Sequence, residues 1–213
     1  TYTVTIKDGN LCTSNLPLTL VDQAGPAATI TASTNVSCHG GNNGSATVNA
    51  TGGVTPYFYV WTPSVQTTQT ANNLVAGVYG VVVTDASGCS AAASIIITEP
   101  ATLIINATGT DPICNGQTNG TGSSSAFGGT TPYAYQWAVL PIQNTPNAIN
   151  LPSGNHVVTV TDALGCVAST SINLNNPALL TATITKADLL CNSICNGTAM
   201  AVTTNGNSPF SYL

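Results

Sequence analysis

One pattern recurs every 76 or 77 residues along this chain of 213 residues. Three cysteines open copies of the pattern: Cys38, Cys114 and Cys191. Three others close copies of it: Cys12, Cys89 and Cys166. A period of this length exceeds that of solenoid repeats and indicates a string of small domains in tandem.

The segments between the cysteines match in the same order. GGVTPY at 52–57 returns as GGTTPY at 128–133. TDASGC at 84–89 returns as TDALGC at 161–166. Motifs that keep both their order and their spacing indicate that each copy folds in the same way.

Prolines mark the junctions between copies, at Pro100 and Pro177. The junctions divide the chain into two complete copies and two partial ones. We predict the C-terminal part of a repeat at 1–21, complete domains at 22–98 and 99–175, and the N-terminal part of a repeat at 176–213.

Strand signals dominate each copy. Tyr79, Val81 and Val83 alternate with small or polar residues, which is the period of a half-buried strand. Six or seven such strands per copy, separated by turn residues, are typical of an antiparallel sandwich. The expected fold is all-β, a tandem array of immunoglobulin-like β-sandwich domains stapled by disulfides.

Charge is nearly absent, since Asp, Glu, Lys and Arg make up only 4% of the residues. Lys7 and Lys186 are the only two basic residues, which excludes a nucleic-acid partner that would need clustered Lys and Arg. No stretch reaches the roughly 18 apolar residues of a membrane-spanning helix.

The cysteines are predicted to form disulfides, which persist in oxidising compartments outside the cytosol. With six strands per repeat, the loops of the opening and closing cysteines lie at the same end, and Cys38 pairs with Cys89. With seven strands, they lie at opposite ends, and Cys38 meets Cys166 of the next repeat. We favour pairing within the repeat, Cys38–Cys89 and Cys114–Cys166, and the alternative stays open.

The three remaining cysteines have no such partner in the sequence. Cys12 and Cys191 are expected to pair with cysteines outside it. Cys195 is additional to the repeat, and a local bridge to Cys191 or a partner outside the sequence is expected for it.

The order of these motifs resembles the SprB repeat. The resemblance rests on Cys, Asn-Gly-Ser/Thr, Gly-Gly-x-x-Pro-Tyr-x-Tyr-x-Trp, Asn-Leu-x-x-Gly and Val-x-Val-Thr-Asp-Ala-x-Gly-Cys, and covers the whole chain. It implies a very large Bacteroidetes cell-surface protein of the kind that includes gliding-motility adhesins. Export, display as filaments and contact with surfaces or polysaccharide are what this resemblance implies.

Metal and catalytic sites have weak sequence support. An aspartate recurs before each closing cysteine, at Asp8, Asp85 and Asp162. These are candidate Ca²⁺ ligands, but Ca²⁺ usually needs several converging carboxylates, so an aspartate that accepts hydrogen bonds from its own turn is the preferred interpretation. No recurrent nucleophile, base or cofactor motif accompanies them, and we expect no enzyme activity and no cofactor.

Aromatic residues alternate along one strand of each copy and end at Trp61 and Trp137. Such a row stacks on sugars if it faces solvent, but more often it forms the core. We predict burial of both tryptophans. An exposed row would instead favour an array of carbohydrate-binding modules.

The expected function is a structural segment of an extracellular adhesin or filament at the bacterial surface. Its expected partners are further copies of itself, and extracellular polysaccharide or surfaces. Two alternatives stay open: the carbohydrate-binding array, and a spacer of an exported hydrolase whose catalytic domain lies elsewhere.

Overall fold

A computed structural model describes residues 2–21, 23–188 and 197–212 of the chain. Every regular element in this part of the chain is a β-strand. None of it forms a helix long and apolar enough to cross a bilayer. The described residues form two compact units. One contains residues up to Val36 together with Gly40–Glu99, and the other contains Ser37–His39 together with residues from Pro100 onward.

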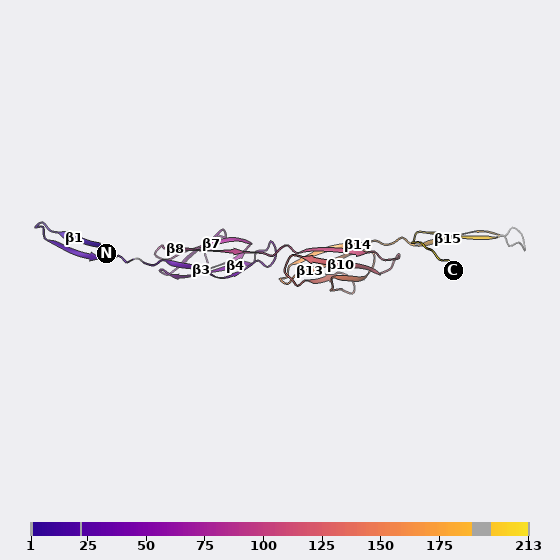
Figure 1. Ribbon diagram of the computed structural model, residues 1–213, viewed down its shortest axis with the longest axis horizontal. Helices are drawn as coiled ribbons and strands as arrows, with labels where there is room; N and C mark the ends of the chain where they lie inside the picture. The colour runs from indigo at the N-terminus through magenta and orange to yellow at the C-terminus, as the bar shows by residue number, and fades with distance from the viewer. Residues whose placement is uncertain (1, 22, 189–196, 213) are drawn as a thin grey trace. The chain divides into compact units, whose positions relative to one another are not determined.

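The first unit contains a sandwich of two three-stranded antiparallel sheets (Figure 1). One sheet has the order β3-β4-β6, with β3 at Pro26–Thr34, β4 at Gly44–Gly52 and β6 at Thr70–Leu74. The other has the order β5-β7-β8, with β5 at Phe58–Thr62, β7 at Gly77–Thr84 and β8 at Ser90–Ile97.

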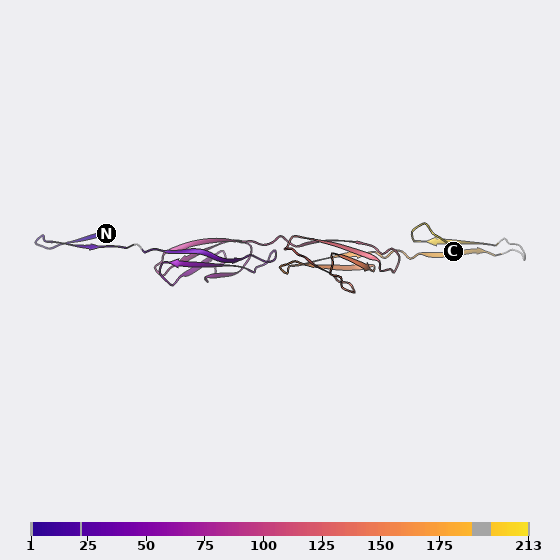
Figure 2. The ribbon, with the colours of Figure 1, turned by 60° about the horizontal axis from the view of Figure 1, so that its bottom comes forward.

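The second unit repeats this arrangement (Figure 2). One sheet has the order β12-β10-β9, with β9 at Ile104–Thr110, β10 at Gly120–Phe127 and β12 at Asn147–Leu151. The other has the order β11-β13-β14, with β11 at Ala134–Trp137, β13 at Gly154–Thr161 and β14 at Val167–Leu174. The prediction of an all-β chain of immunoglobulin-like sandwiches is confirmed.

A tryptophan lies at the centre of each sandwich. Trp61 on β5 and Trp137 on β11 are both fully buried, and alternate residues of the neighbouring strands β7 and β13 pack around them. The alternation arises because successive side chains of a strand point to opposite faces of its sheet. The prediction that both tryptophans are buried is confirmed.

The two ends of the first sandwich are chemically different. The start of β3, the turn from β4 to β5 and the hairpin from β7 to β8 meet at one end, where the Cβ position of Gly53 lies near both Pro26 N and Asp85. At the other end Val36, after β3, donates its N–H to the carbonyl of Thr98, after β8 (2.9 Å). We call these the hairpin end and the exit end.

The connection from β5 to β6 decides which loops share an end. β5 starts at the hairpin end, and β6 finishes at the exit end, where Leu74 pairs with Gly44. Both strands therefore run toward the exit end, and the connecting segment 63–69 must return along the sandwich. Segment 63–69 therefore crosses the length of the sandwich as a seventh strand would. The loops of the opening and closing cysteines consequently lie at opposite ends, although the repeat has six strands.

One hairpin precedes the two sandwiches in the sequence and another follows them: β1 (Tyr2–Lys7) with β2 (Thr13–Leu18), and β15 (Thr181–Ala187) with β16 (Thr198–Thr204). By repeat register, β1 and β2 correspond to β7 and β8, and β15 and β16 correspond to β3 and β4. Tyr2 is 63% exposed, whereas its counterpart Tyr79 is 4% exposed. The apolar row of the hairpin therefore lacks the cover that it receives in a complete sandwich.

Replacement of each tryptophan by phenylalanine separates packing from hydrogen bonding. Trp61 Nε1 donates to the carbonyl of Thr68 (2.9 Å), whereas Trp137 Nε1 is buried without a partner among the described residues. We expect W61F to destabilise its repeat by about 1 kcal/mol more than W137F destabilises the other, because only W61F removes a formed hydrogen bond. Hydrogen exchange resolved by repeat measures both losses, and an equal or reversed order would contradict the assignment.

Candidate functional site

The carboxylate of Asp85 holds two turns together at the hairpin end of the first sandwich. Asp85 follows β7 and is 2% exposed. Its Oδ1 accepts hydrogen bonds from Ser87 N (3.0 Å), Ser87 Oγ (2.7 Å) and Cys89 N (2.9 Å). Its Oδ2 accepts one from Val54 N (3.0 Å), in the turn between β4 and β5. We call this arrangement the carboxylate clasp.

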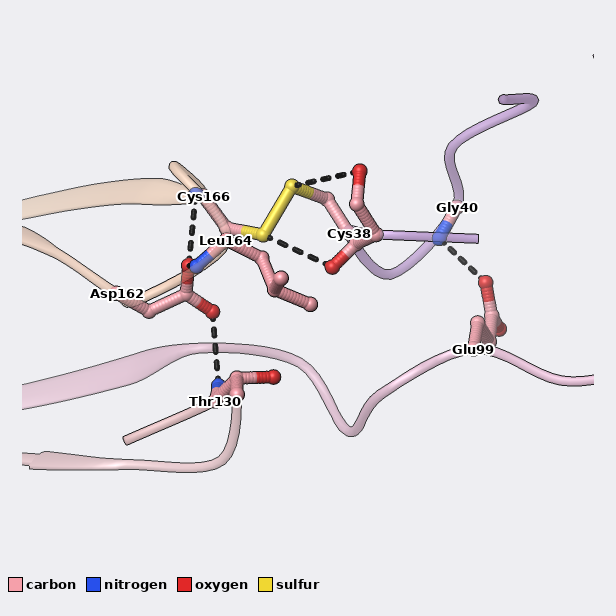
Figure 3. Close-up of a disulfide and its surroundings, with 8 residues drawn as sticks. Cys38, Gly40, Glu99, Thr130, Asp162, Leu164 and Cys166 are labelled. Carbon is pink, nitrogen blue, oxygen red and sulfur yellow. Dashed lines mark hydrogen bonds between the residues drawn. A yellow bond between two sulfur atoms is a disulfide. The ribbon is translucent and has the colours of Figure 1, made fainter. Parts of the chain in front are cut away.

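The second sandwich has the same clasp (Figure 3). Asp162 is 6% exposed, and its Oδ1 accepts hydrogen bonds from Leu164 N (2.9 Å) and Cys166 N (2.8 Å). Its Oδ2 accepts one from Thr130 N (2.8 Å). Leu164 stands where Ser87 stands in the first copy, so this clasp lacks the hydroxyl donor.

The clasp also explains the Gly-Gly motif. Gly53 and Gly129 have φ angles of +64° and +56°, a region that residues with a side chain rarely adopt. A Cβ at Gly53 would lie 2.5 Å from Asp85 Oδ2, and one at Gly129 would lie 2.7 Å from Asp162 Oδ2. The second glycine of each motif therefore lets the turn approach the carboxylate.

Hydrogen bonds lower the pKa of both carboxyl groups. For Asp85 the largest cause is the hydrogen bond from the Ser87 side chain, and backbone N–H donors add to it. For Asp162 the largest single effect is burial, which raises the pKa, but four backbone hydrogen bonds together outweigh it. Both clasps therefore favour the ionised aspartate.

The clasp geometry favours the turn interpretation of the three recurring aspartates over Ca²⁺ binding. In the terminal hairpin, Asp8 Oδ1 likewise accepts from Asn10 N (2.9 Å) and Cys12 N (2.8 Å). These oxygens face N–H groups, whose partial positive charges repel a cation. No cluster of three or more His, Cys, Asp or Glu suited to a metal occurs in the described part of the chain.

A disulfide joins Cys38 to Cys166, with an S–S length of 2.08 Å and a Cα–Cα distance of 5.6 Å (Figure 3). Cys166 Sγ also lies 3.3 Å from the carbonyl oxygen of Ser37. The bond closes a covalent loop of sequence separation 128, and Ser37–His39 belong to the second unit. An opening cysteine is thus bonded to the closing cysteine of the following repeat.

The opening loop is fixed at the exit of its own repeat. Gly40 donates its N–H to Glu99 Oε2 (2.6 Å), directly before the junction proline Pro100 (Figure 3). In the second copy, Gly116 donates its N–H to Asn176 Oδ1 (3.1 Å), directly before Pro177. We did not identify Glu99 and Asn176 from the sequence, although their spacing of 77 residues follows the repeat register and was the available signal.

The favoured pairing of Cys38 with Cys89 and of Cys114 with Cys166 is wrong. Cys38 lies in the loop at the exit end, and Cys89 lies at the hairpin end. The length of β8, which has eight residues, separates them. Eight residues of strand span roughly 27 Å, whereas bridged cysteines have Cα atoms within about 7 Å. The same argument applies to Cys114 and Cys166 across β14. The alternative pairing between neighbouring repeats is the one observed.

The other cysteines differ in their state. Cys12, Cys89 and Cys114 are free thiols, and Cys89 is the only one of the three that is partly buried. Cys191 and Cys195 lie outside the described residues.

Trp61 and Trp137, the carbohydrate candidates, present no ring face to solvent because both are fully buried. His156, which replaces the tyrosine of the first copy, takes over the role of that tyrosine. Its Nε2 lies 2.8 Å from the carbonyl of Pro152, as the hydroxyl of Tyr79 lies 3.1 Å from that of Val75.

Comparison with known families confirms the predicted resemblance. The SprB repeat matches the chain at residues 30–66 and 106–138, one stretch in each complete copy. A search of curated proteins by sequence finds no match.

Similar solved structures are immunoglobulin-domain proteins. A chain from the structural study of Dscam isoform specificity is 12% identical with a TM-score of 0.31, and the match covers 81% of this chain and 53% of that one. The amphioxus IgVJ-C2 molecule is 12% identical with a TM-score of 0.30, covering 72% of this chain and 98% of that one. The four N-terminal domains of Dscam1 isoform 8.4 are 14% identical with a TM-score of 0.25, covering 82% and 47%. This chain thus spans about half the length of the matched Dscam chains.

Replacement of Gly53 by alanine tests the close approach of turn and carboxylate. We expect G53A to destabilise the first repeat by at least about 2 kcal/mol, because the left-handed φ costs roughly 1–2 kcal/mol and the contact with Asp85 adds to it. The control is G77A, whose Cβ would meet only Tyr79 Cε2, at 3.8 Å. Urea unfolding measures both, and a loss for G53A no larger than that for G77A would contradict the role of the clasp.

The lowered pKa values predict a stability that depends on acid. An aspartate with a depressed folded pKa contributes its full stabilisation above the unfolded pKa, about 3.9, and loses it as the pH falls through the folded pKa. We expect the urea midpoint to fall as the pH is lowered from 5 to 2, and to fall less in D85N/D162N. The same slope in the variant would show that other groups carry the acid sensitivity.

Serine replacement of individual cysteines tests the observed bridge. A loop of this length contributes up to about 5 kcal/mol in the chain-entropy model. We expect C38S and C166S to lose similar stability, and C89S and C114S to lose little, because these two thiols are unpaired. Urea unfolding without reductant, with peptide mapping of the bonds, measures this. A large loss for C89S, matched by C114S, would contradict the bridge.

Proposed function

We propose that this chain is a tension-bearing segment of an extracellular adhesin or filament at the bacterial surface. The SprB match and the immunoglobulin-like sandwiches support an extracellular segment of adhesin type. The disulfide supports an oxidising location. The observation that carries the proposal is the position of that bond, between successive repeats.

The covalent path through the chain explains why this position suits tension. A pull on residues before β3 and after β14 reaches Cys38, crosses to Cys166 and leaves through β14. The residues between the two cysteines form a closed loop that tension applied outside it does not extend. Most strands of both sandwiches are thereby removed from the covalent path of the force.

Lateral assembly is the second part of the proposal, and an exposed apolar face of the first sandwich supports it. The outer face of the β5-β7-β8 sheet carries four aliphatic side chains that are 43% to 65% exposed: Val60, Val78, Val82 and Ile96. Val60 pairs with Val82, and Val78 pairs with Ile96, so they form two cross-strand pairs on one face, with Gly80 of β7 between them. We call these four residues the apolar strip.

The second sandwich is polar at the same positions. Gln136, Asn155, Thr159 and Asn173 stand where the apolar strip stands in the first. The sandwich fold therefore does not require an apolar outer face. We propose that the strip packs against the strip of a second copy of the chain, and no charged residue in it opposes this contact.

A variant of the strip built from the residues of the second sandwich tests assembly: V60Q/V78N/V82T/I96N. We expect the unmodified chain to associate at high concentration and to stay associated at 1 M NaCl, where the Debye length is about 3 Å. The variant should remain monomeric in light scattering. Its control, Q136N/T159S/N173S, should associate like the unmodified chain.

Two results would contradict the assembly proposal. One is an unmodified chain that is monomeric at every concentration. The other is an assembly that salt disperses. In either case the repeats would act as spacers without lateral contacts.

A further inference from the structure

Cys89 and Cys114 occupy the same places as the two bonded cysteines. By repeat register, Cys89 corresponds to Cys166 and Cys114 corresponds to Cys38. Both are thiols in this structure. Their surroundings decide whether the correspondence extends to the local geometry.

Cys89 lies in a turn with the same hydrogen bonds as the turn of Cys166. Asp85 N donates to the carbonyl of Cys89 and Asp162 N donates to that of Cys166, both at 2.9 Å. The aspartate Oδ1 accepts from the cysteine N–H at 2.9 Å in the first copy and at 2.8 Å in the second. Cys89 is therefore presented at the hairpin end as Cys166 is.

Cys114 lies in a loop with the same anchors as the loop of Cys38. Gly116 and Gly40, each two residues later, have φ angles of +74° and +71°. Each donates its N–H to the side chain directly before the junction proline, Asn176 or Glu99. Cys114 is thus held at the exit of its repeat, where the following repeat begins in sequence.

A second anchor lies on the strand side of each opening loop. Asp111 Oδ1 accepts from Asn175 N (2.8 Å), as Asn35 Oδ1 accepts from Thr98 N (3.0 Å). Each pair ties the start of the opening loop to the end of the last strand of the same repeat. The opening loops therefore match on both sides of the cysteine.

We infer that the opening cysteine of every repeat bonds to the closing cysteine of the repeat that follows it. Cys114 accordingly takes the closing cysteine of a repeat C-terminal to it, and Cys89 takes the opening cysteine of a repeat N-terminal to it. Within the printed sequence, this rule finds both members only for Cys38 and Cys166, the pair that is bonded. In a longer array the successive loops overlap, so each repeat is bonded to both neighbours. This inference about cysteine pairing holds whether or not the chain bears tension.

The bond forms by exchange with a small disulfide such as oxidised glutathione. A cysteine thiolate attacks one sulfur of the oxidant and releases the first glutathione thiol. The partner thiolate then attacks the mixed disulfide and releases the second. The two cysteines lose two protons and two electrons, and the oxidant becomes two thiols.

A lengthened chain tests the rule: residues 1–175 followed directly by 99–213, so that repeat 99–175 occurs twice. Serine replaces Cys12, Cys191 and Cys195 to remove other thiols. After oxidation in glutathione buffer, we expect two disulfides by mass after alkylation. One is Cys38 with Cys166 of the first copy, and the other is Cys114 of the first copy with Cys166 of the second.

The same substitution in either copy provides the matched control. C114S in the first copy should abolish the new bond, and C114S in the second copy should leave it intact. The Cys38 bond, retained in both variants, reports that the chain has folded. The rule is wrong if Cys114 of the first copy is alkylated as a free thiol, if only C114S in the second copy removes the new bond, or if the new bond joins two molecules.

Discussion

The architecture depends on a constraint of length: a disulfide cannot reach from one end of a sandwich to the other. The opening cysteine follows the exit end and the closing cysteine lies at the hairpin end, because the segment after β5 returns along the sandwich before β6 begins. A cysteine pair within one repeat would have to span a full strand. Cys38 bonds instead to Cys166 of the next repeat, and a local feature of the chain path becomes a covalent link along the chain.

Acidic side chains order both of the segments that carry this link, in a chain with almost no charge. Asp162 orders the turn that carries Cys166, and Glu99 orders the loop that carries Cys38. The clasp aspartate and the side chain before the junction proline occur in both copies. The copies differ in that Leu164 replaces Ser87 in the clasp, and Asn176 replaces Glu99 before the proline. Two of the seven acidic residues thus hold the closing turns of the complete repeats, while the outer faces are free to vary between apolar and polar.

Much of the fold could be predicted from the sequence, because alternation along strands such as Tyr79–Val83 reports burial directly. The burial of Trp61 and Trp137 followed from the same alternation. The pairing of the cysteines could not be predicted, because it depends on how many times the chain crosses from one end of the sandwich to the other. Segment 63–69 returns without regular strand structure, so it has no alternation by which to recognise it. The clasp was visible only as a recurring Asp, since its second half, the N–H of Val54 or Thr130, is backbone.

Single-molecule force extension, with handles at the two ends of the chain, tests the central claim that force crosses from Cys38 to Cys166. The closed loop removes 128 residues from the extensible chain. At about 3.4 Å per residue, the fully unfolded chain should be roughly 430 Å shorter when oxidised than after reduction. C38S should have the reduced length under both conditions. Equal lengths before and after reduction in the unmodified chain would contradict the account.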